Sequence, residues 1–240
     1  MCCLIQEEFK KLRRENKLIP ILFCLVVLEC LISYVIFRTC ENEAIESVIG
    51  KAGLNFYFFC GIQNIFCMIS SMIVNYFLLT QEYIYDTWDL IITKVFDKRK
   101  ICISKYAVFL LYQTGFNIVS VVAYMVVSNV LLPQNMNKRV CLVFVFIILT
   151  IHLFDATVQF CIQLKTGSFV MAAIGGLIYQ VARLQIPQNT PIIKYTPIIS
   201  EIYVFEYNRF LNVGTTGVCC IISVICCYLL VYAISKKFYS

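Results

Sequence analysis

Three ionisable residues lie inside long apolar stretches of the chain, where a charge is costly and usually functional. Glu29 lies in the middle of the stretch 18–37, and His152 and Asp155 lie three residues apart in a later one. That spacing puts both side chains on one face of a helix. A carboxylate beside an imidazole that titrates near neutrality is suited to passing protons. Two interpretations follow: a proton relay, or a hydrogen-bonded pair facing the interior of a helix bundle. The second is favoured.

Uncharged polar residues form further faces in stretches of the same kind. Gln159 continues the stripe of His152 and Asp155, Gln63 lies in an earlier apolar stretch, and Gln113 and Asn117 are one helical turn apart in the next. Hydrogen bonds between helices in lipid contribute roughly 0.6 to 2 kcal/mol each, so such residues often serve assembly. They are equally suited to lining a route for an amphipathic substrate. Packing is favoured, and the route stays open as an alternative.

The chain lacks the common motifs of hydrolytic chemistry. Its single His excludes a zinc site of the HExxH kind, and neither a GxSxG elbow nor a GxxxxGK[ST] loop for ATP occurs. We therefore expect no catalytic residue, no metal site and no bound cofactor in this chain. Any energy for its activity must come from an ion gradient or from another protein.

The composition is that of an integral membrane protein. Hydrophobic residues make up 60% and charged residues 14% of the 240 positions, and the mean hydropathy is +0.81, far from the soluble average. The net charge of +6 is no sign of nucleic-acid binding, because too little chain remains for a domain with a basic groove. We expect one all-α transmembrane domain over residues 1–240.

Six apolar windows are long enough to cross a bilayer, since a spanning helix needs about 20 residues. They are Leu18–Phe37, Leu54–Thr80, Tyr106–Leu132, Val140–Leu164, Thr166–Ile186 and Val213–Ser235. Lys and Arg gather before the first window, between the second and third, and after the sixth, and this bias marks the cytoplasmic side. The sequence therefore predicts six transmembrane helices with both termini in the cytoplasm.

Two segments outside the windows have a distinct character. Residues 1–17 alternate apolar and basic positions, which predicts an amphipathic helix on the cytosolic surface. Residues 187–212 are broken by three prolines and are still apolar, which predicts short helical or re-entrant structure on the extracellular side.

The stretch 81–104 is too amphipathic for a loop and too charged to cross a bilayer. It predicts a cytosolic segment with a helix lying flat on the membrane, against which a separate protein could push. Its aromatic and charged residues suit an interface, because Trp and Tyr anchor partners and charges set the register. An interfacial helix whose aromatic side chains sit among lipid headgroups is the alternative. The candidate coupling residues are Glu82, Tyr85, Asp86, Thr87, Trp88, Asp89, Lys98, Arg99 and Lys100.

The same region, with six spans around it, resembles the ABC-2 type permeases, and within them the lantibiotic-immunity and bacitracin-export permeases. The motif runs from an acidic residue through a Thr-Trp pair and an apolar run to a basic cluster and a Lys: Glu82, Thr87-Trp88, Leu90-Ile91-Ile92, Lys98-Arg99-Lys100 and Lys105. The chain departs from the pattern at Ile84, Asp86 and Val95.

This resemblance implies an ABC-2 exporter permease with the type V ABC transporter fold, in a bacterial plasma membrane. The chain would pair with an identical or related permease and dock an ATP-binding subunit, which holds ATP and Mg, against residues 81–104. The implied substrate is an amphipathic antimicrobial peptide, as in lantibiotic immunity, with drug or polysaccharide export as neighbours. A proton-coupled secondary transporter using Glu29, His152 and Asp155 is the alternative from another class, although such proteins usually carry internal repeats and none is evident here.

Overall fold

The computed structural model describes residues 2–39, 59, 61–85, 98–131, 138–185 and 213–237. Within these ranges the regular elements are helical. They are α1 (Cys2–Arg14), α2 (Leu18–Thr39), a helix over 61–75 that continues into the π-helix η1 (Tyr76–Thr80) and α4 (Gln81–Ile84), then α6 (Lys98–Leu131), α7 (Lys138–Thr166), α8 (Phe169–Gln185) and α10 (Val213–Lys237).

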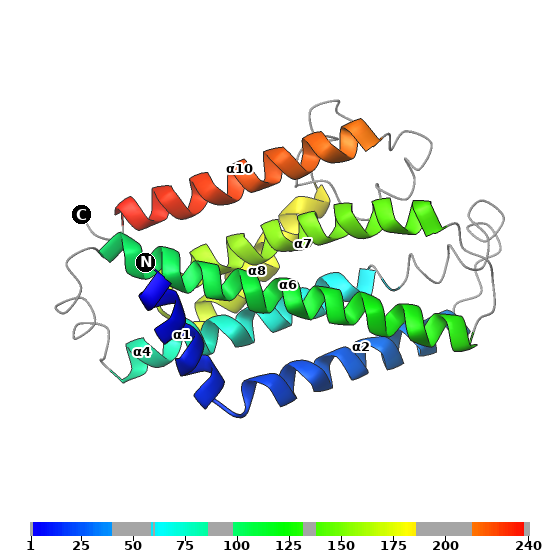
Figure 1. Ribbon diagram of the computed structural model, residues 1–240, viewed down its shortest axis with the longest axis horizontal. Coiled ribbons are helices and arrows are strands. Elements are labelled where there is room, and N and C mark those ends of the chain that lie inside the picture. The colour runs from blue at the N-terminus through cyan, green and yellow to red at the C-terminus, as the bar shows by residue number, and fades with distance from the viewer. Residues whose placement is uncertain are drawn as a thin grey trace.

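The long helices run side by side, and α1 lies across one end of them (Figure 1). Helix α6 packs against α2, α7, α10 and α1, while α7 packs against α8 and α10. The N-terminal helix, α4, the start of α6 and the last turns of α10 share that end, at the left of the view. The bundle thus brings α1, α4 and the start of α6 to the same place.

Each of the six apolar windows overlaps one helix of the bundle. Three of the described helices are long and apolar enough to cross a membrane, at Leu18–Ile36, Gly61–Thr80 and Arg99–Val127, and two apolar helices at Phe169–Arg183 and Cys220–Ala233 are shorter. The third helix begins earlier than its window, because Lys98 to Ser104 already form its first turns. Those residues belong to a long helix rather than to the flat segment predicted over 81–104.

Side chains are distributed inside out relative to a soluble protein. The outward faces of α2, α8 and α10 expose large apolar residues such as Phe23, Ile178 and Val224, whereas Gln113 and Asn117 of α6 are fully buried. Apolar patches of this extent are rare on soluble monomers, and polar groups in a membrane turn toward the bundle interior. The fold is that of a membrane protein.

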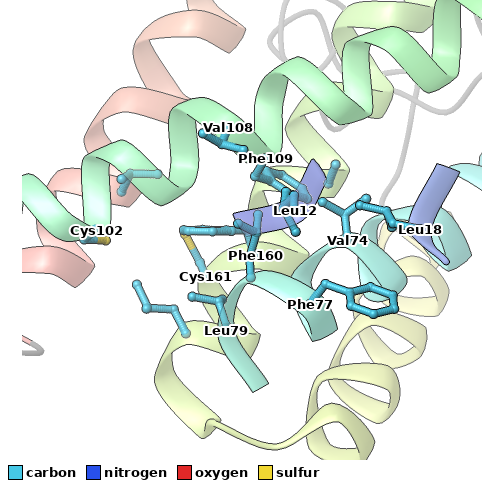
Figure 2. Close-up of a cluster of buried hydrophobic side chains, with 14 residues drawn as sticks. Leu12, Leu18, Val74, Phe77, Leu79, Cys102, Val108, Phe109, Phe160 and Cys161 are labelled. Carbon is cyan, nitrogen blue, oxygen red and sulfur yellow. The ribbon is translucent and has the colours of Figure 1, made fainter. Parts of the chain in front are cut away.

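An apolar cluster packs α1 against the rest of the bundle. Figure 2 shows Leu12 of α1 and Leu18 of α2 among Val74, Phe109 and Phe160 of the long helices. Leu12 and Leu18 expose 1% and 0% of their surface. Burial of a Leu side chain contributes about 1.5 to 3 kcal/mol, so the cluster holds α1 against the ends of the long helices.

Local sequence explains where the helices break. Pro20 lies in the first turn of α2, where its missing N–H leaves no helical bond unmade. Between α7 and α8, Gly167 has φ 62°, a conformation that glycine adopts without strain. The Ser168 hydroxyl then accepts a hydrogen bond from the Met171 N–H at 3.4 Å and caps α8. This short turn places α7 and α8 side by side.

Several predicted features lie outside the described residues. These are the segment 187–212 and the coupling residues Asp86, Thr87, Trp88 and Asp89.

Candidate functional site

Lys105, in the second turn of α6, is the centre of a charge cluster at the end of the bundle that carries α1. Its side chain is fully buried. The Lys105 ammonium donates to Glu82 Oε1 at 2.7 Å and to Glu8 Oε1 at 2.8 Å. Lys11 of α1 also donates to Glu82 Oε1, at 2.6 Å. We call Glu8, Lys11, Glu82 and Lys105 the junction cluster.

The junction cluster joins three elements that are distant in the sequence. Glu8 and Lys11 come from α1, Glu82 from α4 and Lys105 from α6. Two carboxylates and two ammonium groups balance one another, as burial of charge requires. Because each charge-assisted bond is directional, the cluster fixes α1 and α4 relative to the start of α6.

The junction cluster also holds the π-helix η1. Lys105 donates a third hydrogen bond, to the Leu78 carbonyl at 3.2 Å, and Leu78 lies within η1. The Gln81 N–H donates to the Tyr76 carbonyl, five residues earlier. Single π-helical turns within α-helices are frequent at functional sites. One buried lysine thus contacts both the end of the second long helix and the short helix that follows it.

The surface of α1 offers a contrasting ion pair. Lys10 donates to Glu7 Oε1 at 2.9 Å, and both side chains are at least half exposed. The Lys10 ammonium, hydrogen-bonded to Glu7, lowers the pKa of this carboxyl below its usual range. Exposed pairs contribute little to stability, so the buried pairs carry the attachment of α1.

The remaining coupling candidates are at the surface or outside the described residues. Tyr85 is 71% exposed, and Arg99 and Lys100 at the start of α6 are exposed. Lys98 is the first residue of α6. Glu82 differs from these, because only 3% of it is exposed. Its carboxylate joins α4 to α1 and α6 from within the bundle, whereas Tyr85, Arg99 and Lys100 lie at the surface.

A second polar cluster lies between α7 and α8. Asp155 Oδ2 accepts a hydrogen bond from Arg183 Nη1 at 2.6 Å and from Gln180 Nε2 at 3.3 Å. The Tyr179 hydroxyl donates to Asp155 Oδ1 at 2.8 Å. Asp155 and Arg183 have side chains only 6% and 1% exposed. Arg183 is therefore the residue that neutralises Asp155.

The sequence prediction considered His152 as the partner of Asp155 and did not include Arg183. His152 is fully buried, and its carbonyl accepts a hydrogen bond from Cys67 Sγ at 3.7 Å. The signal that points to Arg183 is present in the sequence, because an arginine inside an apolar window is itself a candidate for a buried ion pair.

The other intramembrane candidates make contacts between neighbouring helices. Glu29 of α2 accepts a hydrogen bond from the Ser120 hydroxyl of α6. Gln113 Nε2 donates to Ser70 Oγ at 3.1 Å, and Gln159 Nε2 donates to the Ala172 carbonyl of α8 at 2.7 Å. These contacts join helices, which is the packing role favoured from the sequence.

Two of the candidates, Gln63 and Asn117, are fully buried. Within the described part of the chain, no group of three or more His, Cys, Asp or Glu side chains is placed to hold a metal ion.

A bundle of long apolar helices with polar groups inside and buried charges at one end is the architecture of an integral membrane protein. A family model described as ABC-2 family transporter protein matches residues 4–183. Because the match covers more than half of the sequence, the chain belongs to the ABC-2 family of transporter proteins. The matched residues include the whole junction cluster and the Asp155–Arg183 pair. Neither the curated proteins nor the solved structures gave a match.

Membership of this family makes the chain a transmembrane transport subunit. Components of this kind generally are not themselves catalytic and generally work with an ATP-binding partner.

Proposed function

We propose that this chain is the permease of an ATP-driven exporter in a bacterial plasma membrane, and that the junction cluster transmits the movement of an ATP-binding subunit to the long helices. The observation that carries the proposal is the position of Lys105. Its ammonium contacts α1, α4 and the π-helix η1 at once. A push on the segment after α4 would therefore reach the second and third long helices through one buried group.

The proposal includes six membrane crossings with both termini in the cytoplasm. Its support is the shared end of the bundle: α1, α4, the start of α6 and the last turns of α10 lie together (Figure 1). Basic residues are concentrated in α1 and at the start of α6, which lie at this end, as expected of a cytoplasmic face. A cysteine introduced at Trp88, in a variant without the 14 native cysteines, should react with an impermeant maleimide only after the cells are opened. Labelling of intact cells would refute this orientation.

The ATP-binding subunit is proposed to dock on the segment 81–104, next to the junction cluster. Tyr85 is exposed there, and the basic start of α6 provides charges to set the register. The test is copurification of the ATP-binding subunit with a Trp88→Ala/Asp89→Lys variant from its native membrane. We expect the variant to insert and fold normally and to lose the ATP-binding subunit. Glu7→Lys, a charge reversal on the exposed face of α1, is the control and should retain it.

A full complement of ATP-binding subunit and unchanged transport in the double variant would place the docking surface elsewhere. The second permease is proposed to be an identical or related chain, and the same purification identifies it by mass.

The proposed substrate is an amphipathic antimicrobial peptide, in line with the likeness of residues 81–105 to lantibiotic-immunity permeases. Export of a drug or a polysaccharide is the alternative within the family. Expression with the copurified ATP-binding subunit should raise the concentration of lantibiotic that inhibits a sensitive strain. A rise for other drugs with no change for the peptide would contradict the peptide assignment.

A role as a proton-coupled secondary transporter receives less support. The carboxylate of Asp155 is held by Arg183 and by two further donors of α8. A carboxylate fixed in this way serves to join α7 and α8.

A further inference from the structure

An apolar groove opens on the outside of the bundle beside α1. It has a volume of about 440 Å³ and is lined by α1, α2 and α6. Phe9 closes the end next to α1, and its ring lies 5.8 Å from that of Tyr112 of α6. The volume lies within the range of about 300 to 1,000 Å³ that is usual for ligand sites. We call this feature the α1 groove.

The walls and floor of the α1 groove are apolar. Ile19 and Phe23 of α2 and Leu111 of α6 line it and are more than half exposed, while Phe116 at its floor is buried. Gly115 also lines the groove, and a Cβ added there would meet nothing within 4 Å. A hydrocarbon chain could fill the groove without moving protein atoms.

Basic residues lie close in the chain to the lining residues that α1 and α2 contribute to this groove. Arg13 follows Phe9 by one helical turn on the same face of α1. Lys17 lies in the turn between α1 and α2, two residues before Ile19. Both side chains are exposed, and neither is in an ion pair among the residues that the structure describes. The groove thus combines an apolar slot with a positively charged mouth.

We propose that the α1 groove binds an anionic phospholipid of the cytoplasmic leaflet, with one acyl chain in the slot and the headgroup phosphate on Arg13 and Lys17. The assignment uses the membrane orientation proposed above. Charge complementarity selects this occupant: a cationic peptide would be repelled by the mouth of the groove, and a zwitterionic lipid would gain less from it. Such a lipid would brace α1, which carries half of the junction cluster, against α2 and α6.

Native mass spectrometry of the purified permease tests the proposal with phosphatidylglycerol and phosphatidylcholine as probes. Each basic side chain near an anionic surface contributes a factor of about five. We therefore expect phosphatidylglycerol to bind roughly 10- to 30-fold more tightly than phosphatidylcholine. The variant Arg13→Gln/Lys17→Gln should reduce this preference to less than about threefold. Its control is Arg14→Gln/Lys165→Gln, which removes the same charge from exposed positions away from the slot and should retain the preference.

A second pair of variants tests the slot itself. Gly115→Leu would fill the groove and should weaken binding of both lipids. Gly61→Leu is the matched control, because Gly61 is also an exposed helical glycine with open space around it, and it should bind lipid as the unchanged protein does.

Equal affinity for the two lipids would overturn the proposal, and so would equal binding by the Gly115 and Gly61 variants. Loss of a permease dimer in the Gly115→Leu variant alone, without loss of lipid, would show that a second copy occupies the groove. The measurement needs neither the ATP-binding subunit nor transport, so its failure would leave the proposed function untouched.

Discussion

Replacement of Lys105 by methionine is the most direct perturbation of the junction cluster. Methionine has a similar length and is apolar, so it removes the charge with little change in volume. The substitution leaves Glu8 without its 2.8 Å partner and removes one of the ammonium groups that donate to Glu82. It also removes the donor to the Leu78 carbonyl of η1.

The expected loss of stability follows from burial. The Lys105 side chain is fully buried, and the Glu82 and Glu8 side chains expose 4% and 13%. Removal of one partner of a buried ion pair costs about 3 to 5 kcal/mol, because the other charge stays in a medium of low polarity. For a chain of this size each kcal/mol lowers Tm by about 2 to 4 °C. Lys105→Met should therefore lower the Tm of the purified permease by about 10 °C.

Lys10→Met is the control. This substitution removes a lysine whose distance to Glu7, 2.9 Å, is close to the ion-pair distances of Lys105. Both side chains of the Lys10–Glu7 pair are exposed. Exposed pairs contribute about 0 to 1 kcal/mol, so the expected decrease in Tm is below about 4 °C. Thermal unfolding followed by loss of the monodisperse chromatographic peak measures both. Equal decreases for the two variants would refute the reasoning, because burial would then not determine the cost.

The other predictions concern the interior of the bundle. A Cβ on Gly176 would overlap Gln159 Oε1, and the buried Gln159 side chain is held by its hydrogen bond to the Ala172 carbonyl. Gly176→Leu should therefore lower stability by about 1 to 3 kcal/mol, while Gly61→Leu, with open space, should not. Equal melting temperatures would contradict this close packing. Arg183→Met leaves the buried carboxylate of Asp155 without its counter-charge and should lower the stability by about 3 to 5 kcal/mol. The double variant Asp155→Asn/Arg183→Gln removes both charges and should recover part of that stability. A double variant no more stable than the single one would argue against the ion pair. His152→Gln should leave both the assembled complex and the pH profile of transport unchanged, and loss of transport in an intact complex would revive the proton relay.

Much of the fold could be predicted from local composition. Each apolar window contains a long helix, and α2, α7 and α10 begin within two residues of their windows. Hydropathy is a property of neighbouring residues, so a sequence reports it directly. The basic start of α6 was predicted to belong to the flat segment instead. Charged residues mark the end of an apolar window, but the helix itself continues beyond it.

The sequence identified candidate residues of the two sites but not which of these residues contact one another. The motif marked Glu82 and Lys105 of the junction cluster, whereas Glu8 was not singled out, and Glu8 lies 97 positions from Lys105 in the chain. Periodicity within one helix gives the face of a residue and not its partner on another helix. For the same reason Asp155 was matched with His152, three residues away, rather than with Arg183, 28 positions away.

From the sequence alone, the resemblance to the ABC-2 permeases indicated a transport subunit, and the composition determined the class: a membrane-embedded helical protein with a basic, amphipathic end. Burial in lipid imposes this on composition, since every apolar face must meet hydrocarbon and every exposed charge must meet water. Only the tertiary structure decided that Lys105 joins α1, α4 and η1, and that α1, α2 and α6 leave a groove open beside the basic turn. Both features depend on how helices distant in the chain pack together, because a buried charge is stable only where packing brings its counter-charge within hydrogen-bonding distance.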